Sequence, residues 1–165
     1  MATSHDTIAV VDNGVAAPAV LLIHGNSMCW QAFTGQFESP LAQRYRMIAF
    51  DLPGHGASAN ARDPERSYSI PAYAELALEI LDSLGIREGA ILGWSLGGHI
   101  GLEIMSHWSG LRGLIIVGTP PVAPTPAALA DAFAPTRPRR GLRPFYGRRS
   151  WSQRQSVQRV KRVTL

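Results

Sequence analysis

With 165 residues, of which 45% are hydrophobic, the chain can bury the core of one globular domain. A single cysteine, Cys29, excludes an internal disulfide bond, and no apolar run approaches the ~18 residues that would span a bilayer. The first residues also lack the basic and apolar regions of a signal peptide. We therefore expect a cytoplasmic protein without a membrane partner.

Charge is divided unevenly along the chain. Residues 1–135 contain six arginines and all 12 acidic residues, a net charge of −6. Residues 136–165 contain nine arginines, one lysine and no acidic residue, a net charge of +10. This division predicts a mildly acidic globular body that is joined to a strongly basic tail.

Short apolar runs bounded by turn residues predict the strands. A first short strand is expected at residues 8–11. Four further runs are continuous, as in strands buried on both faces, and they lie at residues 19–23, 47–50, 90–92 and 114–117.

Two helices are predicted between these strands. Ser69 can cap a helix whose apolar residues recur at helical spacing up to Leu84, and Gly85 is a natural stop. A second helix is expected from Leu96 to about Trp108. Because strands and helices alternate, the expected fold class is α/β, a doubly wound, mainly parallel sheet with helices on both faces.

Polar residues stand where the predicted strands end. His24, Asp51, Ser95 and Thr119 each lie at the end of an apolar run. In open α/β sheets, ligands bind at the carboxyl ends of the strands. The sequence therefore predicts that a functional site lies at this edge of the sheet.

The third of these residues lies within a G-x-S-x-G motif at residues 93–97. The motif follows an apolar run and precedes a predicted helix, which is the context of a nucleophile elbow. Gly93 and Gly97 leave room for a tight turn that would expose the hydroxyl of Ser95. Ser95 is therefore a candidate nucleophile.

Three segments together resemble the α/β-hydrolase family: LIHGNS at residues 22–27, DLPGHGAS at 51–58 and GWSLGG at 93–98. The resemblance covers about residues 8–121 and implies a serine hydrolase that acts on esters or related small acyl substrates. Serine at the elbow argues against epoxide hydrolases and haloalkane dehalogenases, which carry aspartate there. No cofactor and no metal ion are expected.

The resemblance also implies roles for individual residues. Ser95 matches the nucleophile, and the backbone N–H groups of Asn26 and Leu96 match the oxyanion hole. Preorganised donors at that position are typically worth ~3 kcal/mol each, because negative charge develops on the carbonyl oxygen during acyl transfer. His24 and Gly25 match residues that shape the oxyanion loop.

The catalytic triad of the family runs in the chain order serine, acid, histidine. No histidine follows His107, and the only acid after Glu103 is Asp131. We therefore expect the triad acid and histidine to be missing, the fold to be truncated before its last strands, and the chain to be inactive as written. Residues 114–117 would then form an uncovered apolar edge that is prone to aggregation.

Four other residues are considered as substitutes. A buried His24 is expected to be satisfied by the backbone, and Asp51 is expected to stabilise a turn. His99 lies on the helix from which the elbow serine points away, and His55 lies on a turn that the family places away from the nucleophile. None of the four is therefore expected to complete the triad.

The domain hypothesis has three parts: the N-terminal part of a hydrolase core (1–121), the start of a lid-like segment (122–135) and the basic tail (136–165). The tail could bind nucleic acid or an anionic membrane through arginines interleaved with Tyr146 and Trp151, or it could be disordered. Its composition favours a third interpretation, translation in a shifted frame. A non-catalytic protein with a nucleic-acid-binding tail is the less favoured alternative, and the oligomeric state stays open.

Overall fold

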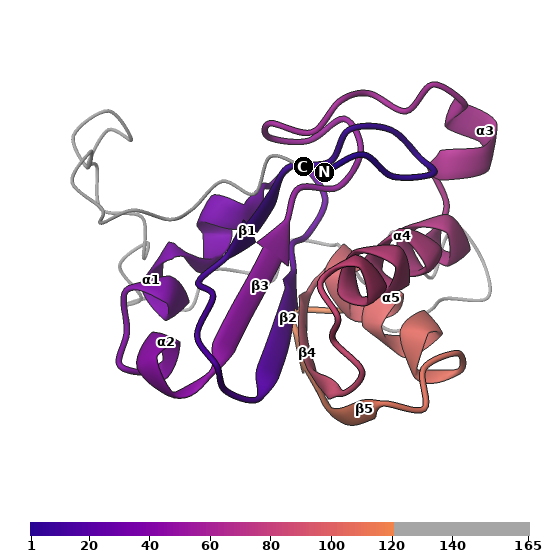
Figure 1. Cartoon of the computed structure of the whole chain (residues 1–165). Helices are drawn as coiled ribbons and strands as arrows, with labels where there is room; N and C mark the ends of the chain where they lie inside the picture. The colour runs from indigo at the N-terminus through magenta and orange to yellow at the C-terminus, as the bar shows by residue number, and fades with distance from the viewer. Residues whose placement is uncertain (121–165) are drawn as a thin grey trace, which may run out of the picture. The chain divides into compact units, whose positions relative to one another are not determined.

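A computed structural model describes residues 1–120, in which five strands form one sheet (Figure 1). Along the chain the strands are β1 (Val10–Asp12), β2 (Ala19–Ile23), β3 (Arg46–Phe50), β4 (Gly89–Trp94) and β5 (Leu111–Val117). Their order in the sheet is β1-β3-β2-β4-β5. β2 to β5 pair in parallel and β1 pairs antiparallel with β3, so the prediction of a mainly parallel sheet is confirmed.

The strand order changes direction at β2. From β2 the chain moves outward to β3, and it then returns to form β4 on the other side of β2. In open α/β sheets such a switch point leaves a crevice at the carboxyl ends of the two strands that flank it. The segments that follow β2 and β4 are therefore the ones that this topology brings together.

Helices lie on both faces of the sheet (Figure 1). The short helices η1 (Trp30–Phe33), α1 (Thr34–Phe37) and α2 (Leu41–Arg44) lie on one face. On the other face lie the two longest helices, α4 (Ile70–Ser83) and α5 (Leu96–Met105). The short α3 (Pro64–Ser67) precedes α4. This arrangement confirms the doubly wound architecture.

The central strands are buried on both faces. Leu21 and Ile23 of β2 belong to the core cluster that includes α4 and α5, whereas Leu22 packs with Phe33 and Met47 on the opposite face. Successive side chains of a strand point to opposite faces, so a strand between two helical layers needs apolar residues at every position. This requirement explains the continuous apolar run at residues 19–23.

The start and stop signals of α4 act as the sequence predicted. The side chain of Ser69 accepts a hydrogen bond from the backbone N–H of Ala72, at 3.3 Å. Gly85, just after the helix, has a φ of +70°, a conformation that glycine adopts without steric cost. The helix buries Leu76 and Ile80 completely against the sheet.

Some boundaries differ from the prediction. β1 begins at Val10 rather than Ile8 and includes Asp12, whose carboxylate forms an ion pair with Arg46 on β3 at 2.7 Å. β5 begins at Leu111 rather than residue 114, and α5 ends at Met105 rather than near residue 108. The four-residue helices η1, α1, α2 and α3 were not predicted because so few residues show no periodicity.

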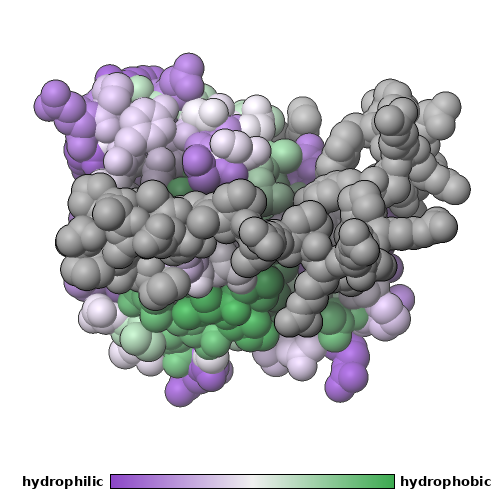
Figure 2. Space-filling view, turned by 180° about the vertical axis from the view of Figure 1, so that it is seen from behind, coloured by the Kyte–Doolittle hydropathy of each residue, from purple (hydrophilic) through white to green (hydrophobic). Residues whose placement is uncertain are grey.

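β5 forms one edge of the sheet within the described residues, and its residues 114–117 are apolar, as the sequence predicted. The side chains of Ile115, Ile116 and Val117 are 54%, 41% and 48% exposed. Leu102 and Met105 on the neighbouring α5 are also exposed. Figure 2 shows an apolar area on one face of the surface, and most of the large exposed apolar residues of the described part belong to these two elements.

The lid-like segment 122–135, with Asp131, and the basic tail 136–165 lie outside the described residues. Among residues 1–120, no helix is both long and apolar enough to cross a bilayer.

Candidate active site

Ser95 occupies a sharp turn between β4 and α5. Its φ of +54° and ψ of −113° lie in a region that a non-glycine residue rarely adopts, at a cost of about 1–3 kcal/mol. Three hydrogen bonds hold this backbone: the N–H of Ser95 donates to the carbonyl of Val117 at 2.8 Å, and its carbonyl accepts from Gly98 N–H at 2.9 Å and Thr119 Oγ1 at 3.0 Å. The end of β5 therefore stabilises the strained turn.

Glycines around the turn allow the backbone segments to approach closely. A Cβ atom on Gly93 would collide with the carbonyl of Gly97, and one on Gly97 would collide with the carbonyl of Ile23 on β2. A Cβ atom on Gly98 would collide with Oγ1 of Thr119. The elbow therefore packs tightly between β2 and the segment after β5. Gly93 and Gly97 accept no side chain without a backbone shift, and at Gly98 the side chains of Thr119 and Ile116 would have to move.

The loop after β2 packs directly against the elbow. A Cβ atom on Gly25 would lie 3.1 Å from Cβ of Ser95 and 3.2 Å from the carbonyl oxygen of Trp94. Asn26, the next residue, is exposed. Leu96 begins α5, where backbone N–H groups lack helical partners and the helix dipole favours negative charge. Within residues 1–120, the N–H groups of Asn26 and Leu96 donate to no other residue.

His24 is fully buried at the end of β2 and is satisfied by the backbone, as expected. Its Nε2 accepts the N–H of Leu52 at 3.0 Å, so the proton lies on Nδ1, which donates to the carbonyl of Gly25 at 2.7 Å. Burial lowers the pKa of His24, and the hydrogen bond to Gly25 and the charge of Asp51 offset this only in part. His24 is therefore neutral, and it links the loop after β2 to the loop after β3.

Asp51 is also fully buried, at the end of β3. One carboxylate oxygen accepts the N–H of Trp30 at 2.6 Å, and the other accepts the N–H of Ala57 at 2.8 Å. Gly56 has a φ of +53°, and a Cβ atom there would overlap the carboxylate. Asp51 thus joins the start of η1 to the turn after β3, and the interpretation that it stabilises a turn is confirmed.

His55 contacts Ser27 in the loop after β2, which the sequence did not predict. Its Nε2 accepts the N–H of Ser27 at 3.3 Å, and its Nδ1 lies 3.0 Å from the carbonyl of Pro53. The centre of its ring lies 5.3 Å from that of His24. Ser27 itself has a φ of +58°. His24 and His55 therefore lie next to each other, and both form hydrogen bonds with the loop after β2.

Strand register explains why these segments meet. β2 and β3 are parallel neighbours, and their last residues, Ile23 and Phe50, are paired. The segments that follow them therefore leave the sheet at the same level. If the pairing of β2 with β3 is known, the motifs at residues 22–27 and 51–58 are expected to lie side by side, and this would have predicted the contact between Ser27 and His55.

All five histidines of the chain lie within residues 1–120, and none is hydrogen-bonded to Oγ of Ser95. His99 lies on α5, and its side chain makes no hydrogen bond to another described residue. His107, which follows the end of α5, is exposed and lies 3.2 Å from a carboxylate oxygen of Glu103 on that helix. In the described part of the chain, no group of three or more His, Cys, Asp or Glu side chains could hold a metal ion.

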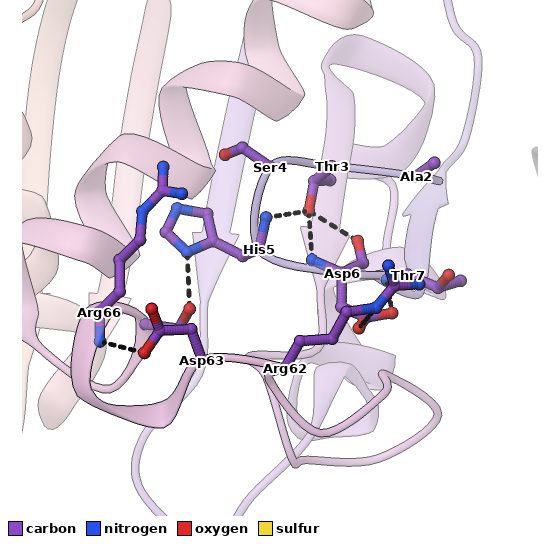
Figure 3. A pocket seen from close by; sticks show the side chains of 10 residues that line it. Ala2, Thr3, Ser4, His5, Asp6, Thr7, Arg62, Asp63 and Arg66 are labelled. Carbon is purple, nitrogen blue, oxygen red and sulfur yellow. Dashed lines mark hydrogen bonds and ion pairs between the residues drawn. The ribbon is translucent and has the colours of Figure 1, made fainter.

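A hollow of about 240 Å³ lies elsewhere on the surface, between residues 2–7 and 62–67 (Figure 3). At its base His5 is buried with Nδ1 3.1 Å from Oγ of Ser67. Glu79 on α4 accepts hydrogen bonds from the same N-terminal segment. These contacts attach the N-terminal segment to α3 and α4. None of the residues that line the hollow belongs to the segments around the elbow.

The sequence pattern of the Alpha/beta hydrolase family matches residues 20–163. The chain therefore belongs to the α/β-hydrolase family. The match extends past residue 121, beyond the range that the three motifs cover.

Similar proteins include hydrolases and esterases. A 2-hydroxymuconate semialdehyde hydrolase from Pseudomonas putida is 37% identical over 130 residues, which cover 76% of this chain and 44% of that protein. A pimeloyl-[acyl-carrier protein] methyl ester esterase from Aeromonas hydrophila is 38% identical over 105 residues, which cover 63% and 39%.

A solved structure of the N-acyl homoserine lactonase AidH, complexed with N-butanoyl homoserine, has a TM-score of 0.72 and 47% sequence identity to this chain. The alignment covers 74% of this chain and 45% of the lactonase. The chain thus spans less than half the length of each of these three proteins.

Proposed function

We propose that this chain carries the nucleophile and the oxyanion hole of a serine hydrolase whose substrate is a carboxylic ester, a lactone or a related acyl compound. In this proposal Ser95 is the nucleophile, and the backbone N–H groups of Asn26 and Leu96 stabilise the oxyanion. The observation that carries the proposal is the strained backbone of Ser95, which hydrogen bonds with Val117, Gly98 and Thr119 hold in place. The loop that contains Asn26 packs against this turn through Gly25. Strain of this kind is concentrated at functional sites.

The proposed reaction begins when Oγ of Ser95 attacks the carbonyl carbon of the substrate and loses its proton to a base. The carbonyl oxygen becomes negatively charged, and it accepts hydrogen bonds from the N–H groups of Asn26 and Leu96, which donate to no other residue of the described part. When this intermediate collapses, the bond to the alcohol oxygen breaks and that oxygen takes up the proton from the base; the alcohol leaves from an ester and stays attached to the acyl group of a lactone. Water then hydrolyses the acyl-serine that remains. The position of Leu96 at the start of α5 adds the favourable helix dipole.

The base is the part of this mechanism that the described geometry does not supply. A serine hydroxyl without a base is a weak nucleophile, and a triad enzyme that loses its histidine keeps only the help of the oxyanion hole and of binding. Because no histidine of this chain contacts Oγ of Ser95, we propose that the chain by itself acylates slowly. We expect an added base to accelerate this step.

The substrate class is inferred from the similar proteins. Their names describe an esterase, a lactonase and a semialdehyde hydrolase, and the first two cleave a bond between an acyl carbon and oxygen. Attack by a serine on an acyl carbon is the chemistry that such a bond requires. We therefore propose an ester or lactone in preference to the other hydrolase substrates of the family.

Reaction of the full chain with a fluorophosphonate probe tests the proposal. The probe mimics an acyl substrate, and its phosphorus forms a bond to the serine oxygen as fluoride leaves. We expect slow labelling of Ser95, faster labelling in the presence of imidazole, and no labelling of the variant Ser95→Ala. Equal labelling of that variant, or no labelling of the natural chain even with imidazole, would overturn the proposal.

A further inference from the structure

The loop that contains Asn26 is attached to the turn after β3 by two histidines. Nε2 of His24 accepts the N–H of Leu52 while its Nδ1 donates to the carbonyl of Gly25, and the N–H of Ser27 donates to Nε2 of His55. The two attachments flank Asn26 on either side. Within residues 1–120, Asn26 itself makes no hydrogen bond, so its orientation depends on its two neighbours.

Of these two hydrogen-bonded residues, Ser27 is the one with a strained backbone. Ser27 is exposed, and its φ of +58° places it in the left-handed region that favours glycine. The bond to His55 is the only hydrogen bond that Ser27 makes within the described residues. A residue in this region persists only where its surroundings hold it, and here the holding contact is the imidazole.

His55 is itself fixed so that it can accept this bond. Because Nε2 accepts the N–H of Ser27, the proton of the neutral ring lies on Nδ1, which donates to the carbonyl of Pro53 at 3.0 Å. The ring also packs against the ring of His24 at a tilt of 50°. Both carboxylate oxygens of Asp51, at the end of β3, accept hydrogen bonds from backbone N–H groups.

We propose that His55 is a positioning residue of the oxyanion hole. Its Nε2 keeps Ser27 in the left-handed conformation, and this conformation sets the peptide N–H of Asn26 beside Ser95. Gly25, which packs against Ser95, fixes one end of the loop, and His55 fixes the other. The link to catalysis depends on the proposed role of Asn26, whereas the attachment of Ser27 to His55 does not.

Three substitutions of His55 separate this role from simple packing. His55→Gln keeps an acceptor at a similar distance from the backbone, His55→Asn keeps a polar side chain that is too short, and His55→Phe keeps a ring without an acceptor. His107→Phe is the matched control, because His107 is exposed and lies beyond the C-terminal end of α5. Ser27→Gly relieves the left-handed strain and should reduce the dependence on His55.

Two measurements on the full chain test the proposal: amide hydrogen exchange at Ser27 and the rate of fluorophosphonate labelling with imidazole present. Loss of one hydrogen bond should lower the protection of the Ser27 amide and the labelling rate roughly fivefold to tenfold in the Asn and Phe variants. We expect His55→Gln and His107→Phe to stay within about twofold of the natural chain by the same reasoning. Adding Ser27→Gly to His55→Asn should restore most of the labelling rate.

The outcomes distinguish this proposal from the proposed function. If the Asn variant folds and loses protection at Ser27 while labelling is unchanged, His55 does not position the oxyanion hole, although Ser95 remains a nucleophile. If the Gln and Asn variants behave alike, the acceptor is irrelevant and the proposal is overturned. If the natural chain is never labelled, the proposed function fails and the positioning role fails with it, whatever the exchange at Ser27 shows.

Discussion

The loops at the carboxyl ends of β2, β3 and β4 differ from the outer strand β5 in the contacts that their side chains make. In the loops, buried polar groups such as Asp51 and His24 have partners for each polar side-chain atom, and strained residues are held by hydrogen bonds. On β5, the side chains of Ile115 and Val117 are about half exposed. Specific contacts are therefore concentrated at the proposed site, whereas the exposed side chains of the outer strand gain little from packing.

The largest effect should come from the elbow itself. Gly97→Ala places a Cβ atom against the carbonyl of Ile23, and overpacking of backbone against backbone should destabilise the fold by about 3 kcal/mol or more. Gly35→Ala on α1 is the control, because no atom lies within 4 Å of its Cβ position. Urea unfolding of both variants measures the difference. Equal unfolding midpoints would show that the elbow is not tightly packed.

A smaller loss of folding stability is expected for Asp51→Asn. The amide keeps one acceptor but presents its NH₂ group to a backbone N–H, and a buried donor left without a partner costs about 1–3 kcal/mol. Asp82→Asn tests the same chemical change on the surface, where an exposed ion pair with Arg87 is worth at most about 1 kcal/mol. Chemical unfolding at neutral pH compares the two. A larger loss in the Asp82 variant would contradict the comparison.

Acid should weaken the loops through His24. Burial lowers the pKa of this imidazole in the folded chain, so below the ordinary value of 6.5 the unfolded chain binds a proton that the folded chain does not. The stabilisation is therefore complete above pH 6.5 and is lost as the pH falls through the lower pKa of the folded state. Urea unfolding from pH 8 to pH 5 should show this loss.

His24→Gln should flatten that pH dependence, because it removes the titrating group, even though it lowers stability at neutral pH. His107→Gln, which replaces an exposed histidine, should leave the slope as it is in the natural chain. Parallel slopes in all three proteins would mean that His24 is not the group responsible.

Local patterns were sufficient to predict most of the fold. A buried parallel strand needs apolar residues at every position, so residues 19–23 were identified from their composition alone. Ser69 and Gly85 bound α4 through their own backbone and side-chain chemistry. The helices of four residues around Trp30 and Leu41 depend on packing against the sheet, and no periodicity in so short a segment can indicate them.

The candidate site was only partly accessible from the sequence. The positions of Ser95 and His24 at strand ends followed from the motifs, because each motif directly follows a strand. The contact between His55 and Ser27 joins residues 28 positions apart, and it requires both the order and the register of β2 and β3. A motif predicts the conformation of its own segment, whereas pairing between two motifs is a property of the sheet.

The smallest change in stability is expected on β5, where two neighbouring residues face opposite sides. Leu114 is half-buried and packs against the helical core, whereas Ile115 is 54% exposed. Ile115→Thr should alter the free energy of unfolding by about 0.5 kcal/mol or less, and it should reduce aggregation because it removes apolar surface from an edge strand. Leu114→Thr should cost about 1–3 kcal/mol, because it places a hydroxyl in an apolar environment.

Light scattering on warming and urea unfolding together measure these two effects. A gain in solubility without a loss of stability in the Ile115 variant would show that this side chain contributes little to the folded chain. If the Ile115 variant is instead destabilised as much as the Leu114 variant, the outer face of β5 packs as tightly in solution as the inner face. The contrast between the loops and the outer strand would then disappear.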